Sequence, residues 1–180
     1  MSDTARIMLI GFGNPGRLDD GLGPLFAEAM AERQVPGLTV DADYQLTVEA
    51  AAYVAEHDIV VFADAAVDGP EPFWINAIEP VSQQSFSSHS VAPEAVLGLA
   101  HDLFGAKTKG YLLGMRGYEF NEFDERLSEQ AQKNLEAALA HFEPVFRTGN
   151  VAESAEEFPC LGGYRLSNSN QEEPCKTENT

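Results

Sequence analysis

Two continuous apolar runs of strand length, separated by segments with helical periodicity, limit most strongly what this chain can fold into. Residues 6–11 read Arg-Ile-Met-Leu-Ile-Gly, and residues 59–64 read Ile-Val-Val-Phe-Ala-Asp. A strand that is apolar at nearly every position is buried on both faces, as strands of a parallel sheet are. Such a sheet needs helices on both sides, so the pattern predicts an α/β protein.

The segments around these two runs complete the pattern. An apolar stripe at the helical period follows the first strand, at Leu22, Leu25, Phe26, Ala29 and Met30. Three further helices are expected over residues 47–56 with Thr47 as cap, from Ser90 to residue 104, and over residues 128–146. Three further strands are predicted at residues 38–42, 73–78 and 110–115.

This alternation predicts a three-layer α/β/α sandwich on a mainly parallel, twisted, five-stranded sheet. The strand at 73–78 has no crossover helix before it, so it can run antiparallel. Residues 1–148 are expected to form the domain, and residues 149–180 a polar tail without regular structure. Both cysteines, Cys160 and Cys175, lie in that tail, so neither a disulfide framework nor a thiol nucleophile is expected in the domain.

The charge of the chain limits its partners. The 180 residues carry a formal net charge of −18, which argues against nucleic acid and anionic membranes. No stretch approaches the roughly 18–20 apolar residues of a membrane span, and the start of the chain does not read as a leader. We therefore expect a cytoplasmic protein without membrane insertion.

A glycine-rich loop follows the first strand and admits two interpretations. Gly11-Phe12-Gly13-Asn14-Pro15-Gly16 matches the dinucleotide fingerprint, and an acidic residue (Asp41 or Asp43) follows at a suitable distance. However, Asp19 and Asp20 stand where the next helix begins and would repel a pyrophosphate. The alternative role for the glycines is a tight turn that lets backbones approach closely.

Three candidate metal ligands, Asp20, Asp64 and His89, come from segments expected at one edge of the sheet. Asp19 or Asp20 can cap the helix while its neighbour points elsewhere. Asp64 ends a buried strand, and ligands of open α/β sheets bind outside the carboxyl ends of strands. His89 lies in a serine-rich loop. Each residue also has a simpler interpretation, as a cap, a turn residue or a surface histidine.

Together these residues would supply two carboxylates and one imidazole, which suit Zn²⁺ or Ni²⁺ with open coordination positions. Such a site can polarise a carbonyl or lower the pKa of a bound water. The sequence contains no HExxH, EF-hand, P-loop or G-x-S-x-G pattern, so other common hydrolase sites are not indicated.

Over residues 5–147 the sequence resembles the hydrogenase maturation proteases. The resemblance is carried by residues 10–15 (Ile-Gly-Phe-Gly-Asn-Pro), 19–23 (Asp-Asp-Gly-Leu-Gly), 62–65 (Phe-Ala-Asp-Ala), 88–90 (Ser-His-Ser) with Pro93, 114–117 (Gly-Met-Arg-Gly) and 127–128 (Leu-Ser). Residues 41–46 replace the Gly-Thr pair of many members and resemble the branch that serves NAD-linked bidirectional hydrogenases.

The resemblance implies a phosphorylase/hydrolase-like fold and an endopeptidase. Its substrate would be a nickel–iron hydrogenase large-subunit precursor, which loses a C-terminal peptide after nickel insertion. Asp20, Asp64 and His89 would contact nickel supplied by that precursor, although zinc or another divalent ion could occupy the same ligands. The alternative is a nickel- and precursor-binding chaperone that cleaves nothing.

Overall fold

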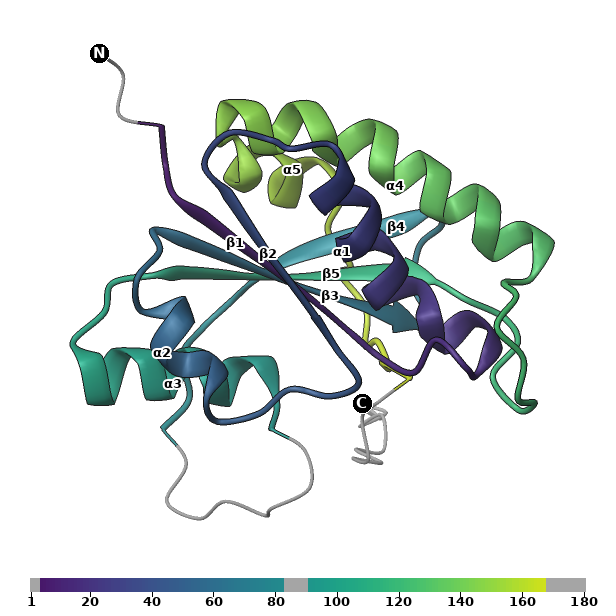
Figure 1. Cartoon of the computed structure of the whole chain (residues 1–180), viewed down its shortest axis with the longest axis horizontal. Helices are drawn as coiled ribbons and strands as arrows, with labels where there is room; N and C mark the ends of the chain where they lie inside the picture. Colours follow the sequence, from purple (N-terminus) through teal and green to yellow (C-terminus); the bar gives the residue numbers. More distant parts are fainter. Residues whose placement is uncertain (1–3, 83–90, 168–180) are drawn as a thin grey trace, which may run out of the picture.

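One five-stranded sheet separates the helices of the chain into two layers (Figure 1). The computed structural model describes residues 4–82 and 91–167. The strands are β1 (Ile7–Phe12), β2 (Leu38–Asp43), β3 (Ile59–Ala66), β4 (Phe73–Ile78) and β5 (Lys109–Arg116), in the spatial order β2-β1-β3-β5-β4. All neighbours are parallel except β4, which runs antiparallel to β5. The predicted mainly parallel sheet and its antiparallel strand are confirmed.

The helices lie on both faces of this sheet, as predicted. They are the 3-10 helix η1 (Leu18–Gly21), α1 (Leu22–Glu32), α2 (Ala50–Val54), α3 (Pro93–Phe104), α4 (Glu129–Thr148) and α5 (Val151–Glu157). Figure 1 shows α1, α4 and α5 on one side and α2 and α3 on the other. Within the described ranges, no helix combines the length and apolar composition that a membrane crossing requires.

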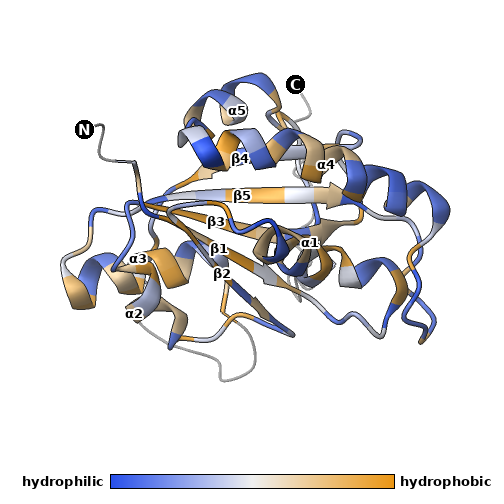
Figure 2. Cartoon of the chain, turned by 45° about the horizontal axis from the view of Figure 1, so that its top comes forward, coloured by the Kyte–Doolittle hydropathy of each residue, from blue (hydrophilic) through white to orange (hydrophobic). Residues whose placement is uncertain are grey.

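The two predicted apolar strands form the centre of the molecule. All six residues of β1 are buried, and so are seven of the eight residues of β3. Alternate side chains enter two cores: Ile7 and Leu9 face the α1 and α4 side, whereas Met8 and Ile10 face α2 and α3. Figure 2 shows this hydrophobic centre with hydrophilic helix surfaces around it. Burial on both faces explains why these runs lack alternation.

Two predicted helix starts differ from the structure. The second helix is only Ala50–Val54, and Thr47 contributes a backbone carbonyl to Ala50 N (3.3 Å) rather than a side-chain cap. The third helix begins at Pro93, because proline fixes φ at a helical value and needs no amide partner in the first turn. Ser90, its predicted cap, lies outside the described residues. By contrast, the Ser128 hydroxyl caps α4 by accepting from Ala131 N (3.3 Å).

The structure also differs from the predicted unstructured tail, because residues 150–167 are folded. After α5, Phe158 packs on Phe73 with ring centroids 5.2 Å apart, and Tyr164 lies on Trp74 at 4.3 Å. Cys160 is buried as a free thiol. These apolar residues are too widely spaced to give a periodic pattern, yet they cover the outer strand β4. Residues 168–180, including Cys175, lie outside the described range.

Two glycines allow α1 to lie directly on the sheet, and one of them gives a stability test. A Cβ atom on Gly11 would come within 2.2 Å of Gly23 O. We expect Gly11→Ala to lower the free energy of unfolding by about 2 kcal/mol, because helix and strand must separate. Urea denaturation measures this. In the control Gly162→Ala, the new Cβ meets no described atom within 4 Å, so a change below about 0.5 kcal/mol is expected.

A pH-dependent stability is expected from His141, which joins α4 to α5. Its Nε2 lies 3.0 Å from Ser154 Oγ, and its ring packs on Phe73 and Phe158. Burial lowers the pKa of His141 below 6.5, and the charge of Glu157 partly opposes this. The folded state therefore binds this proton less readily than the unfolded state, and stability is lost as pH falls through about 6.5.

Denaturation of wild type and His141→Gln at about pH 7.5 and about pH 5.5 tests the sign. Acidification should cost the wild type more unfolding free energy than it costs the variant. An equal loss in both proteins would contradict the lowered pKa.

Candidate active site

The register of the sheet brings Asp64 to the loop that carries Asp20. Strands β1 and β3 are parallel neighbours, with Gly11 opposite Ala63, so the loop after β1 and the end of β3 share one edge. One hydroxyl confirms the proximity: Ser167 Oγ donates to Asp20 Oδ1 and lies 3.4 Å from Asp64 Oδ1. The predicted convergence of these two aspartates is therefore observed.

The glycine loop is folded around Asp20. The side chain of Asp20 is 4% exposed, and its Oδ2 accepts from Asn14 N (3.1 Å). Gly16 N in turn donates to Asn14 Oδ1 (2.9 Å). These two loop amides, which a dinucleotide site would offer to a pyrophosphate, are thus bonded to acceptors of the protein itself. This arrangement favours the tight-turn interpretation of the loop over the NAD interpretation.

Asp19 has a structural role, different from that of its neighbour. Its buried carboxylate accepts four hydrogen bonds from the connection between β5 and α4: Tyr118 N (2.8 Å), Glu119 N (3.0 Å), Ser128 N (2.7 Å) and Ser128 Oγ (2.7 Å). One aspartate of the pair was expected to cap the helix while the other pointed elsewhere. The structure shows no side-chain cap at η1 or α1, because the Asp19 carboxylate bonds a distant loop instead, while Asp20 lies near Asp64.

Asp64 is fully buried within β3. Its Oδ1 accepts from Ala65 N (2.8 Å) in addition to its contact with Ser167. A carboxylate that is removed from water is stabilised by donors or by a cation. Asp20 and Asp64 thus form a site of two buried carboxylates that contact one hydroxyl, and their oxygen atoms suit a divalent cation.

The third predicted ligand, His89, lies outside the described residues. Among residues 4–82 and 91–167, no group of three His, Cys, Asp or Glu side chains is placed to hold a metal ion. The metal-contacting trio Asp20, Asp64 and His89 therefore stays a prediction, with two of its members brought together.

Ser167 was missed by the sequence analysis. It belongs to the polar segment for which no structure was expected, and its position depends on backbone pairing with β3 rather than on periodicity. The sequence holds one weak signal: Tyr164 and Leu166 flank Arg165 in an alternating pattern after two glycines.

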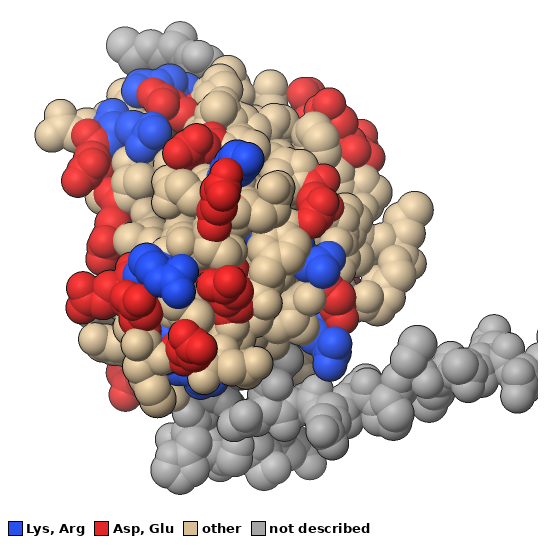
Figure 3. All heavy atoms as spheres, turned by 90° about the vertical axis from the view of Figure 1, so that its right-hand side faces the viewer, with Lys and Arg blue, Asp and Glu red and all other residues tan. Residues whose placement is uncertain are grey.

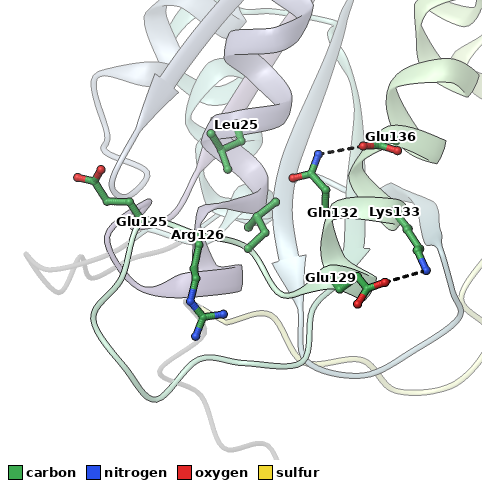
Figure 4. A pocket seen from close by; sticks show the side chains of 8 residues that line it. Leu25, Glu125, Arg126, Glu129, Gln132, Lys133 and Glu136 are labelled. Atoms are coloured by element: carbon green, nitrogen blue, oxygen red, sulfur yellow. Dashed lines mark hydrogen bonds and ion pairs between the residues drawn. The ribbon is translucent and has the colours of Figure 1, made fainter.

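A separate open hollow of about 820 Å³ lies where α1, residues 125–127 and the first turns of α4 meet (Figure 4). It is lined by Leu25, Glu125, Arg126, Leu127, Glu129, Gln132, Lys133 and Glu136. Neither Asp20 nor Asp64 is among the described residues that line it. Figure 3 shows the corresponding end of the molecule, where acidic side chains are spread among fewer basic ones.

The fold occurs in hydrogenase maturation proteases of known structure. The [NiFe] hydrogenase maturation protease HycI of Thermococcus kodakarensis KOD1 superposes with a TM-score of 0.62 at 23% identity, covering 81% of this chain and 95% of that chain. The endopeptidase HybD of E. coli gives 0.56 at 20% identity, covering 80% and 93%. The hydrogenase 2 maturation peptidase of Thaumarchaeota archaeon SCGC_AB-539-E09 gives 0.57 at 19% identity, covering 79% and 99%. No family model and no curated protein matches the chain.

The different roles of Asp19 and Asp20 predict different stability losses. Asp19→Asn removes the charge from a buried acceptor of four hydrogen bonds, so we expect a loss of about 3 kcal/mol in unfolding free energy. Asp20→Asn should cost clearly less, because it also relieves repulsion with Asp64. Chemical denaturation of both variants makes the comparison, and equal losses would contradict the assignment.

Proposed function

We propose that this chain is a hydrogenase maturation endopeptidase. It removes the C-terminal peptide of a nickel–iron hydrogenase large-subunit precursor after nickel insertion. The observation that supports this best is the meeting of Asp20 and Asp64 at the carboxyl ends of β1 and β3, in a fold that hydrogenase maturation proteases share. The resemblance of residues 10–23 and 62–65 to the motifs of that family points to the same function.

In this proposal, nickel arrives with the precursor and docks against Asp20, Asp64 and His89. The two carboxylates neutralise part of the ion's charge and hold it beside the scissile peptide bond. The ion then either polarises the peptide carbonyl or activates a water molecule. Asn14 N donates to the Asp20 carboxylate and holds it in place, and Asp19 binds the connection between β5 and α4.

Docking of this kind makes proteolysis a test of metal insertion. Without nickel, the precursor would offer these two buried carboxylates only neutral hydrogen-bond donors, which stabilise a pair of negative charges less than a divalent cation does. Only a nickel-loaded precursor therefore gains the free energy of binding between the ion and the carboxylates.

The end of β2 is the proposed site of substrate recognition. Residues 41–46 lie beside the glycine loop, since Gly13 N donates to Asp43 O (3.1 Å). Tyr44 in this segment is 65% exposed, so its ring is available for contact with a partner protein. We assign the precursor of an NAD-linked bidirectional hydrogenase to this surface, following the resemblance of residues 41–46.

The alternative function is a nickel- and precursor-binding chaperone that uses the same ligands without cleavage. It differs from the protease in its product alone, so the mass of the precursor after incubation distinguishes the two.

Mass spectrometry of a nickel-loaded precursor, incubated with the protein, tests the proposal. We expect loss of a C-terminal fragment with nickel and an intact precursor without it. Asp20→Asn, Asp64→Asn and His89→Ala should each slow cleavage at least about 100-fold, because metal polarisation contributes several kcal/mol. A folded His89→Ala protein that cleaves at the normal rate would refute its role.

Two control variants separate loss of the site from general damage. Asp58→Asn removes a carboxylate just before β3, at the opposite end of the strand from Asp64. His57→Ala removes an imidazole that bonds Tyr53 O and Thr39 Oγ1 near α2. Both should cleave at the wild-type rate. An intact nickel-loaded precursor after incubation with the wild type would favour the chaperone.

A further inference from the structure

The last described segment of the chain runs from α5 to the acidic pair. It first follows the outer strand β4, where Ile75 N donates to Phe158 O (2.8 Å). Asn76 then exchanges two hydrogen bonds with the backbone of Cys160, at 2.9 and 3.2 Å. Tyr164 stacks on Trp74, on the α2 and α3 side of the sheet. In Figure 1 this yellow segment crosses behind the sheet toward the ends of the strands.

Residues 165–167 add a short strand to the end of β3. Leu166 forms an antiparallel bridge with Ala66, Val67 N donates to Arg165 O (2.9 Å), and Ser167 N donates to Ala65 O (3.0 Å). The position is available because the pairing of β1 with β3 ends at Ala63, while β5 pairs with β3 as far as Ala66. Peptides commonly bind proteins in this way, through main-chain hydrogen bonds to an open strand edge.

Side-chain contacts with three aspartates fix the register of the added strand. Asp68 accepts from Arg165 N (2.6 Å) and from Arg165 Nε (3.0 Å). Two residues later, the Ser167 hydroxyl reaches Asp20 and Asp64. The segment therefore places a neutral hydroxyl on the carboxylates that the proposed reaction needs.

We propose that residues 165–167 are an intramolecular latch in the binding position of the peptide substrate. An extended segment of the precursor replaces the latch and bonds the same backbone groups, Ala65 O and Val67 N. This inference rests on the proposed function for the identity of that peptide. The linked latch acts at an effective concentration on the order of 1 mM, so a weak peptide does not displace it.

The precursor's nickel supplies the additional binding free energy that displaces the latch, which a nickel-free peptide lacks. The Ser167 hydroxyl has one proton to donate, which goes to Asp20 while Asp64 lies at 3.4 Å, whereas a divalent cation binds both carboxylates at once. Displacement of Ser167 is thus favourable for a nickel-loaded precursor and unfavourable for a nickel-free one. The latch makes the protein more selective for the loaded precursor.

Two variants of the full chain open the latch by different means. Arg165→Glu places a carboxylate against Asp68, and Ser167→Pro removes both the amide that bonds Ala65 and the hydroxyl that reaches the aspartates. In each variant the Val67 amide should exchange its hydrogen at least tenfold faster than in the wild type, measured by NMR. Unchanged Val67 exchange in both variants would overturn the proposal.

A labelled probe peptide tests whether the opened position binds an extended chain. The probe has the sequence of residues 161–167, Leu-Gly-Gly-Tyr-Arg-Leu-Ser. Fluorescence anisotropy should show at least tenfold tighter binding to Arg165→Glu than to the wild type, because the linked competitor is removed. Equal affinity for both proteins would overturn the shared binding position.

A rescue and a control variant complete the design. Adding Asp68→Lys to Arg165→Glu restores an ion pair and should restore the slow exchange of Val67. Arg147→Glu breaks another exposed ion pair, with Glu143 at 3.0 Å near the end of α4, and should change neither the Val67 exchange nor the probe affinity. Failure of the rescue would contradict the role of the Asp68 contact.

The readings also separate this inference from the proposed function. One outcome is fast Val67 exchange and tight probe binding in Arg165→Glu, together with a precursor that neither the wild type nor the variant cleaves. That outcome would confirm the latch and contradict the protease. If the precursor is cleaved, Arg165→Glu should cleave it several-fold faster at low concentration. A rate equal to that of the wild type would overturn the inhibitory role.

Discussion

The arrangement of the acidic edge depends on the hydrogen bonds that hold the carboxylate of Asp19. Four donors from the connection between β5 and α4 surround it, and a buried carboxylate with that many donors is held in one position. Asp20 is the next residue in the chain, so the position of its backbone is fixed by the same hydrogen bonds. The close contact of Gly11 with Gly23 sets the distance between α1 and the sheet, and with it the position of the loop that carries Asp20.

Much of the fold and part of the site follow from local patterns. The uninterrupted apolar runs of β1 and β3 predict parallel neighbours, and Asp64 at the end of the second run then falls at the ligand-binding edge. Asp19 and Asp20 are adjacent and chemically identical, so only tertiary contacts, the four hydrogen bonds to Asp19, distinguish their roles. Thr47 resembles a cap, but its carbonyl rather than its side chain meets α2. Backbone pairing of residues 165–167 leaves only a weak signal in the sequence, the alternation of Tyr164 and Leu166 about Arg165.

Charge connects the fold to the proposed chemistry. Asp20 and Asp64 are withdrawn from water near each other, an arrangement that raises the free energy of the resting protein unless a donor or a cation is present. The Ser167 hydroxyl is a weak partner for the two carboxylates, and the nickel of a loaded precursor would be a strong one. The same pair thereby connects the position of residues 165–167 with the preference for a nickel-loaded precursor that we propose.

The cover that residues 158–160 place over β4 also affects how the domain can be handled. An uncovered outer strand offers a row of unpaired amides and carbonyls to other molecules and promotes aggregation. A chain cut after α4, at the end of the resemblance to the proteases, would lose the Phe158 and Cys160 contacts with Ile75 and Asn76. Aggregation of such a fragment would lower its activity without any change at Asp20 and Asp64, so variants for biochemistry should keep the chain through Ser167.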